Sequence, residues 1–482
     1  MPNSHPSSLR AAWVALAGLS AVFLFEMLDN SILNVALPTI GRELHASTVA
    51  LQWVTGAYAV VFGGLMLVFG AIADRYGRRR VMLVGLVLLG LASLATAFVS
   101  SAGELIAVRG LMGVAAAMTT PGSAALAFRL FDDDRLRVRA ITLVSTIGLV
   151  GLAIGPMSGG FVLAVAPWQV LLLINVPIAA LAFAGIRSGI AADDPADLHR
   201  DPVDVLGALL GTAAVVFALI APTLYVNGGP AVPATVAAVV AAILFVVRER
   251  TARHPLLDLK LVARPLVSAG LAYKAAAGLA VAGMSYMVTL QLQLDWGWSP
   301  ALAALGLLPQ VVVLIGGSPF VDPFVKKAGL DRAAWLSATA VVTGLAVYGL
   351  LSRFGYVWVA VALALVAAGM RVIGTVAAVN VIGGLPANRT TIGAALTDTA
   401  TEVSSGAGVA VTGTILAAVF SGGLATSHWT GHQTAQFHHA ITLAGLTLTA
   451  VAAALVAWAY VRTRHAAPQD SEPVPGEELQ PA

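Results

Sequence analysis

Four acidic side chains stand inside segments that are otherwise apolar. Glu26 and Asp29 are three residues apart in one such segment, and Asp398 and Glu402 are four residues apart in another. At these spacings the two members of a pair share one face of a helix. An ionised side chain near the centre of a bilayer costs roughly 3 kcal/mol, so it is normally paired, protonated or turned toward water. Two adjacent carboxyl groups resist simultaneous ionisation, which suits the reversible binding of a proton.

A buried arginine is the expected partner of some of these acids. Counted from the expected helix ends at ~1.5 Å per residue, Arg371, Glu402 and Glu26 lie at similar depths. We therefore predict that Arg371 pairs with Glu402 or with Glu26, as a group that tunes the site and contributes to gating. A fixed salt bridge is the competing interpretation for the two glutamates, and a helix-end hydrogen bond for Asp29. Asp29 and Asp398 lie at other depths, so we predict that they exchange protons.

Aromatic and thioether side chains occur in the same apolar segments. Tyr58, Phe62, Tyr286 and Met287 could line a cavity, since flat cations are attracted to ring faces and a thioether adapts its shape. Packing inside the helix bundle is the alternative. The chain has no cysteine, and the histidines before the last apolar segment have no acid or thiol companion, so we expect no metal site and no cofactor. The lack of a GxxxxGK[ST] loop argues against direct use of ATP.

The segments that position these side chains are long enough to cross a bilayer as helices. Apolar residues make up 58% of the chain and charged residues 11%, and the mean hydropathy is +0.87. A soluble domain carries about a quarter charged residues. Runs of about 20 apolar residues recur, which predicts an all-α integral membrane protein with about fourteen transmembrane helices. The expected spans are 13–37, 51–73, 81–100, 104–128, 139–164, 168–188, 203–225, 231–247, 266–294, 300–321, 333–352, 355–384, 390–421 and 437–461.

The distribution of lysine and arginine predicts which ends of the spans face the cytoplasm. With the amino terminus inside, only Arg42 and Arg353 of the 27 basic residues fall outside the cell, as expected when retained loops carry the positive charge. Both termini are then cytoplasmic, with residues 1–12 as the N-terminal segment and the acidic, proline-rich residues 466–482 as a disordered tail. The basic pI of about 9.3 thus reflects topology and no nucleic-acid partner. Lys274 is close enough to the cytoplasmic end of its span to reach the surface, so we assign it no role.

The loop after the second span reads GAIADRYGRRRV, from Gly70 to Val81, and it resembles the glycine, aspartate and arginine motif of the major facilitator superfamily. Glycines permit a tight turn, an aspartate can cap a neighbouring helix, and arginines anchor to phosphate or carboxylate groups. SPFVDPFVKKAG, from Ser318 to Gly329, resembles a degenerate second copy. The residues expected to serve structure and gating here are Gly70, Asp74, Arg75, Gly77, Arg78 and Asp322.

The fifth span carries GLVGLAIGPMSGG, from Gly148 to Gly160, and it resembles the antiporter motif that in this superfamily is tied to exporters. Gly155, Gly159 and Gly160 would let another helix approach closely, and Pro156 would bend the span where two halves of the protein must rock. The resemblance implies export more than import.

Three further strings resemble the fourteen-helix drug:proton antiporter-2 family, closest to its QacA and SmvA branch. They are LDNSILNVALPTI (Leu28–Ile40), INVP (Ile174–Pro177) and ALTDTATEVSSGAGVAVTGT (Ala395–Thr414). The resemblance implies a six-helix bundle at 13–190, two inserted helices at 203–247 and a second six-helix bundle at 266–461. Gly56 and the Trp168-Gln169 pair depart from the pattern, which weakens the case for divalent cations.

That branch implies a proton-coupled exporter of amphipathic, cationic drugs, antibiotics or biocides in the bacterial inner membrane. Asp29 and Asp398 would contact the substrate as well as protons, and Arg109 matches a buried arginine linked to proton transfer, with a structural ion pair as its alternative. The expected partners are protons, an amphipathic small molecule and membrane lipid, with the protein acting as a monomer. Uptake by symport is disfavoured by GPMSGG. A membrane enzyme or sensor would need a large appended domain or a hydrolytic triad, and the sequence contains neither.

Overall fold

Every regular element that the structure describes is helical. The computed structural model covers the chain, and the described residues are 6, 8–193, 204–226, 229, 231–253, 255–385, 390–421 and 429–464. Within them, 13 helices are long and apolar enough to cross a membrane, or up to 14 if one bent pair is counted as a single span. The predicted all-α membrane fold is therefore confirmed. The expected segment 1–12 is described only at residue 6 and from residue 8 onward, and the tail 466–482 lies outside the described residues.

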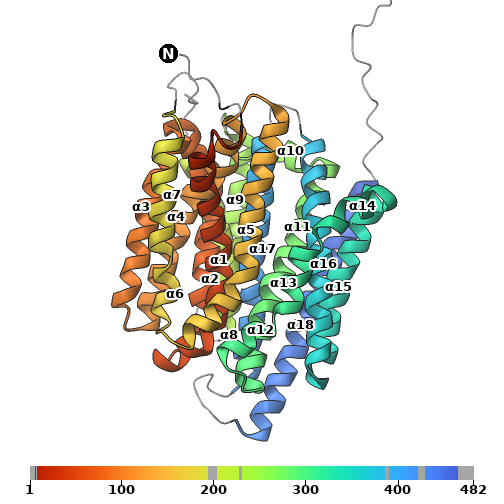
Figure 1. Ribbon diagram of the computed structural model, residues 1–482. Coiled ribbons are helices and arrows are strands. Elements are labelled where there is room, and N and C mark those ends of the chain that lie inside the picture. The colour runs from red at the N-terminus through yellow and green to blue at the C-terminus, as the bar shows by residue number, and fades with distance from the viewer. Residues whose placement is uncertain are drawn as a thin grey trace, which may run out of the picture.

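The first half of the chain forms a bundle in which α1 packs against α5 and α7, and α2 packs against α4. The long helices run side by side (Figure 1). The sixth span is interrupted, so that two helices share it. The helices of this half are α1 (Trp13–Glu43), α2 (Thr48–Tyr76), α3 (Arg78–Ala95), α4 (Ala102–Arg129), α5 (Asp134–Leu163), α6 (Gln169–Leu173) and α7 (Asn175–Gly189).

Two helices follow that pack against each other, α8 (Val205–Val226) and α9 (Ala231–Thr251), with the short α10 (Leu259–Val262) after them. α8 also packs against both α2 and α17. Thr212 of α8 donates from Oγ1 to the main-chain oxygen of Gly64, at 2.7 Å. The inserted pair is thus attached to the junction between the two halves.

In the second half α11 packs against α16, α17 and α18, and α15 packs against α16. α11 continues into one turn of π-helix at Gln291–Asp295. The helices of this half are α11 (Pro265–Leu290), α12 (Pro300–Leu305), α13 (Leu308–Gly316), α14 (Ser318–Ala328), α15 (Leu330–Leu351), α16 (Tyr356–Gly383), α17 (Thr390–Val419) and α18 (Gly431–Arg464).

The tenth span differs from the single helix that was expected over 300–321. It is divided into α12, α13 and α14, with a bend of 59° between Pro300–Gly316 and Pro319–Ala328. Pro309 and Pro319 each stand in the first turn of a new helix. A proline has no amide hydrogen to donate and clashes with the preceding turn, so it begins a helix more readily than it continues one.

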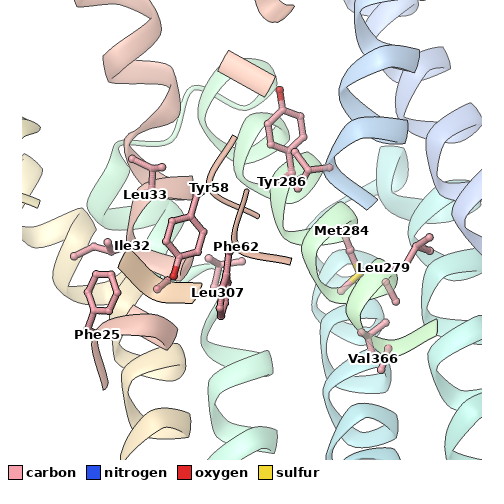
Figure 2. Close-up of a cluster of buried hydrophobic side chains, with 14 of the residues drawn as sticks. Phe25, Ile32, Leu33, Tyr58, Phe62, Leu279, Met284, Tyr286, Leu307 and Val366 are labelled. Atoms are coloured by element: carbon pink, nitrogen blue, oxygen red, sulfur yellow. The ribbon is translucent and has the colours of Figure 1, made fainter. Parts of the chain in front are cut away.

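The two halves meet along several helices. Gln52 of α2 donates from Nε2 to the main-chain oxygen of Ala410 on α17, at 3.1 Å. Gln293 donates from Nε2 to the main-chain oxygen of Val35 on α1, at 2.8 Å. These contacts lie near the C-terminal end of α1 and the N-terminal end of α2. Figure 2 shows buried side chains of α1, α2 and α11 packed near this junction.

Candidate functional site

A cavity lies between the two halves, lined by α1, α2, α4 and α5 on one side and by α11, α13, α16 and α17 on the other. It contains about 1120 Å³ of space free of protein atoms, open solvent at its mouth included. Most lining side chains are apolar or small. Arg109 from the first half and Glu402 from the second are its charged members. The thioethers of Met27 and Met370 also line it.

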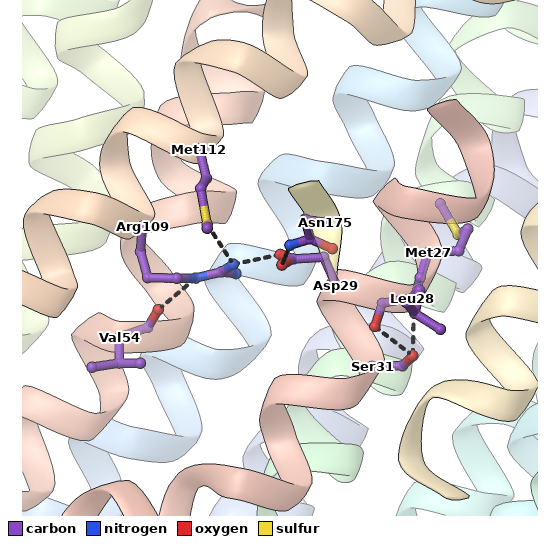
Figure 3. A network of polar contacts seen from close by, with 8 residues as sticks. All are labelled: Met27, Leu28, Asp29, Ser31, Val54, Arg109, Met112 and Asn175. Atoms are coloured by element: carbon purple, nitrogen blue, oxygen red, sulfur yellow. Dashed lines mark hydrogen bonds and ion pairs between the residues drawn. The ribbon is translucent and has the colours of Figure 1, made fainter. Parts of the chain in front are cut away.

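Asp29 is held in a buried polar network (Figure 3). Arg109 forms an ion pair with it through Nη1, and both side chains are almost fully excluded from solvent. Asn175 donates from Nδ2 to Oδ1 of Asp29, at 2.9 Å. Arg109 also donates from Nε to the main-chain oxygen of Val54, at 3.2 Å, and its guanidinium carbon lies 4.5 Å from the ring centre of Tyr58. The negative charge of Asp29 is thus paired with the positive charge of Arg109. This geometry agrees with the interpretation of Arg109 as a member of a structural ion pair.

Asn175 was not identified as a site residue from the sequence. The INVP string drew attention to this position only as a family match, and the residue comes 146 positions after its partner. The signal that could have found it was a buried asparagine at the start of a helix, where an amide must find a hydrogen-bond partner.

Glu26 makes no described hydrogen bond to the Asp29 network and lies near acids of the second half. Thr120 of α4 donates from Oγ1 to Oε2 of Glu26, at 2.8 Å. Glu26 also lies close enough to Glu402 and Asp398 to interact with them electrostatically. Acids from α1 and α17 therefore form one cluster across the junction. Of these acids Glu402 lines the cavity, whereas Asp29 and Asp398 are not among its lining residues.

Arg371 does not join this cluster. It lines a groove together with Phe320 on another side of α16, whereas the preceding residue, Met370, lines the central cavity. Successive side chains of a helix point about 100° apart, so equal depth is not enough to bring two residues together. The prediction that Arg371 pairs with Glu402 or Glu26 is wrong, because no ion pair joins it to either of these described acids. Its role in gating stays a prediction.

Lys274 is half-buried and lies near the acids of α17. It interacts electrostatically with both Asp398 and Glu402. Its depth alone predicts that it reaches the cytoplasmic face, without a role in the site. Its ammonium lies near these acids because the side of α11 that carries Lys274 is the side that packs against α17.

The aromatic and thioether residues expected to line the cavity are packed inside the bundles instead. Tyr58, Phe62, Tyr286 and Met287 are each at most 1% exposed and are absent from the cavity lining. The ring of Tyr58 packs against Phe62, with 5.6 Å between centres, and against the guanidinium of Arg109. The packing alternative therefore describes these four side chains. Figure 2 shows three of them, Tyr58, Phe62 and Tyr286.

The motif from Gly70 to Val81 forms the link between α2 and α3. Gly77 has a φ of 104°, which favours glycine, and a Cβ there would lie 2.5 Å from Oδ2 of Asp193. Asp74 was expected to cap a helix, but it accepts a hydrogen bond from Nε of Arg78 at 2.8 Å. The cap of α3 comes from Asp193, which accepts from the main-chain amide of Arg79 at 3.1 Å.

The remaining residues expected to serve structure and gating in the two copies of this motif are Gly70, Arg75 and Asp322. Gly70 lies inside α2 and not in a turn, and a Cβ there would meet only Pro121, at 3.9 Å. The prediction that it serves the turn is therefore wrong. The guanidinium of Arg75 lies 5.7 Å from the ring centre of Tyr76. Asp322 belongs to α14, and its side chain lies outside what the structure describes.

The glycines of the antiporter-like motif lie where α5 approaches its neighbours most closely. A Cβ on Gly155 would overlap the hydroxyl of Ser31 on α1, and a Cβ on Gly159 would lie 2.8 Å from Ile32. On Gly160 it would lie 2.6 Å from the main-chain oxygen of Pro300, the first residue of α12. Pro156 lines the cavity. One face of α5 thus packs against α1 inside the first half, and the adjacent face contacts the second half.

Comparison with known proteins gives consistent matches over most of the chain. A family model described as "Major Facilitator Superfamily" matches residues 19–202. The multidrug efflux pump LfrA of Mycolicibacterium smegmatis is 30% identical over 423 residues, which cover 86% of this chain and 83% of LfrA. The methyl viologen resistance protein SmvA of Salmonella typhimurium is 28% identical over 433 residues, which cover 85% and 83%. Among solved structures, the POT family transporter PepTSo matches with a TM-score of 0.64 at 15% identity, over 93% of this chain and 99% of that chain.

Proposed function

Because the chain belongs to the major facilitator superfamily and its relatives include drug and antibiotic efflux pumps, we propose that it is a proton-coupled exporter of amphipathic cations. It is a multi-pass membrane protein of a transporter family and not an enzyme. The bacterial relatives support a location in the cytoplasmic membrane, with protons, lipid and an amphipathic small molecule as its partners. The charge pattern of the loops supports cytoplasmic termini.

The observation that carries the proposal is an excess of acids around the central cavity. Asp29 is matched by Arg109. Three further acids form one electrostatic cluster, namely Glu26, Asp398 and Glu402. Lys274 is the cation that interacts with this cluster among the described side chains. Such an excess of carboxylates in a low-dielectric site favours binding of external positive charge, either as protons or as a cationic molecule.

Protons and the cationic substrate would replace each other at these carboxylates, and the inward proton gradient would then drive the cation out of the cell. With the cavity open to the cytoplasm, Glu402 ionises and attracts a cation, while Met27 and Met370 adapt to its apolar part. With the cavity open to the other side, protons neutralise the acids and the cation leaves. A proton on Asp29 would also release the guanidinium of Arg109, which lines the cavity and would repel a cation.

The proposal is tested by proton movement in everted membrane vesicles that contain the protein. Addition of tetraphenylphosphonium or ethidium should dissipate an imposed pH gradient, and Glu402→Gln should abolish this response. Glu43→Gln, at the exposed end of α1, is the matched control and should respond like the wild type. An unchanged pH gradient with every cation tested, or full activity of Glu402→Gln, would refute the proposal. Movement of cation and proton in the same direction would favour symport.

A further inference from the structure

We infer that Lys274 is a tethered counter-cation of Asp398 and Glu402, which a bound cation must replace at these carboxylates. The inference rests on the proposed binding of a cation in the central cavity. It assigns Lys274 as a positioning residue that determines how many external positive charges the site accepts.

The register of α11 against α17 carries this assignment. A Cβ on Gly278 of α11 would lie 2.7 Å from the main-chain oxygen of Thr401, and a Cβ on Gly283 would lie 3.1 Å from that of Gly408. The contacting residue numbers increase in the same direction along both helices, so α11 and α17 are parallel and closely packed. Lys274 stands one turn before Gly278 and therefore on the same face.

One helical turn before Gly278, the same alignment of the two helices places Lys274 beside the segment of α17 from Asp398 to Glu402. The ammonium interacts electrostatically with both carboxylates. It forms no direct ion pair with either of these two described side chains. One cation is thus shared by two acids and bonded tightly to neither, which leaves it free to be displaced.

The other charged groups on helices packed against α11 do not replace Lys274 in this position. Glu26 on α1 reaches the cluster through Glu402 and adds a further negative charge. Arg371 on α16 lines a separate groove. Arg462 on α18 is bound near the start of α11, where it donates from Nε to Oγ of Ser268 at 3.0 Å.

A counter-cation on a flexible stem has a defined effect on exchange. When the site is empty, the ammonium lowers the electrostatic cost of ionised acids in an apolar surrounding. When a cation binds, it must compete with the ammonium for the same carboxylates. Without the lysine, about one further proton should occupy the acids at rest, and that proton should leave when a cation binds.

The experiment uses the full-length protein in lipid nanodiscs and titrates it with tetraphenylphosphonium, ethidium and cetyltrimethylammonium. Binding is measured by calorimetry in two buffers that differ in ionisation enthalpy, so that both the Kd and the number of released protons are obtained. At about pH 9, where few protons compete, Lys274→Met should bind these cations roughly tenfold or more tightly. Near neutral pH, where the additional proton occupies the acids, it should also release about one more proton per bound cation. Lys274→Arg, which keeps the charge, should match the wild type.

Two controls separate this effect from damage to the fold. Lys260→Met, on the exposed side of α10, should leave the Kd and proton count unchanged. The charge-conserving double variant Lys274→Met/Asp398→Asn should fold and return the number of released protons to the wild-type value.

Infrared spectra of the unliganded protein give a measurement that needs no ligand. Lys274→Met should show about one additional protonated carboxyl group near neutral pH.

The outcomes distinguish the two proposals. If the wild type binds the cations but Lys274→Met shows the same Kd, proton count and carboxyl spectrum, the role of Lys274 is refuted and cation export is not. If the wild type binds none of the cations, cation export fails, and the inference for Lys274 fails with it.

Discussion

Glu26 and Glu402 belong to different halves of the protein, yet they lie close enough for their carboxyl groups to interact electrostatically. Two ionised carboxylates so placed repel each other in a low-dielectric surrounding. The pair therefore makes the stability of the closed junction depend on protonation. Binding of a proton or of a cation between them would draw the halves together, and loss of both would push them apart.

The first prediction concerns this repulsion. Above neutral pH, Glu26→Gln and Glu402→Gln should each raise the thermal unfolding temperature in detergent, because each removes one member of a repelling pair. The double variant should gain less than the sum of the two, with a coupling of about 1 kcal/mol. Strictly additive changes would show that the two carboxyl groups do not interact. Glu43→Gln serves again as the exposed control.

The second prediction concerns the buried ion pair of Asp29 and Arg109. Arg109→Met should destabilise the protein by about 3 kcal/mol or more, because it leaves a buried carboxylate unpaired. Asp29→Asn in the same chain should recover much of that loss, whereas proton-driven efflux stays absent. Asn175→Ala removes one hydrogen bond to a charged group and should cost about 1.5 to 3 kcal/mol. Arg353→Met, at an exposed position, is the control, and an equal loss in Arg353→Met would contradict a special role for the pair.

The third prediction uses the glycines of α5 and α4. Gly155→Ala and Gly160→Ala should lower both stability and efflux, because the added methyl groups collide with Ser31 and with Pro300. Gly110→Ala on α4 meets nothing within 4 Å. It should be neutral or stabilising by up to about 1 kcal/mol, as expected for alanine in a helix. Thermal unfolding and vesicle efflux, measured side by side, check this contrast, and equal effects at Gly110 and Gly160 would refute the packing argument.

The fourth prediction concerns the topology. The chain has no cysteine, so single introduced cysteines report without background. Gly77 is unsuitable for labelling, because its positive φ and the nearby Asp193 would strain any side chain. Arg80→Cys and Gly431→Cys occupy exposed positions. In intact cells an impermeant maleimide should label Gly431→Cys and not Arg80→Cys, and the reverse pattern would overturn the cytoplasmic assignment of the termini.

Much of the fold followed from the sequence because a bilayer imposes a simple rule on length and polarity. The spans could be located from apolar runs, and the acid pairs on α1 and α17 could be recognised from spacing alone. The break in the tenth span could not be placed, although Pro309 and Pro319 were visible. A proline predicts where a helix is interrupted but not the angle at which the chain resumes.

The site was harder to predict, because depth in the membrane is only one of the coordinates that bring side chains together. Depth correctly grouped Glu26 with Glu402. It failed for Arg371, whose neighbour Met370 occupies the cavity-facing direction. It failed also for Lys274, whose partners are set by the register between α11 and α17. Rotation about the helix axis and register between helices depend on packing, which a single sequence does not contain.

The attachment of α8 has a consequence for how the halves separate. Because α8 packs against both α2 and α17 and is hydrogen-bonded to Gly64, the two halves are bound along that seam. The opposite seam, where α5 meets α12 and α13, is held by close contacts of Gly160 without such a covering helix among the described contacts. Rotation about the bound seam would open the protein on one flank only. We therefore expect an amphipathic molecule dissolved in the bilayer to enter sideways between α5 and α13, with the inserted helices acting as the fixed hinge side.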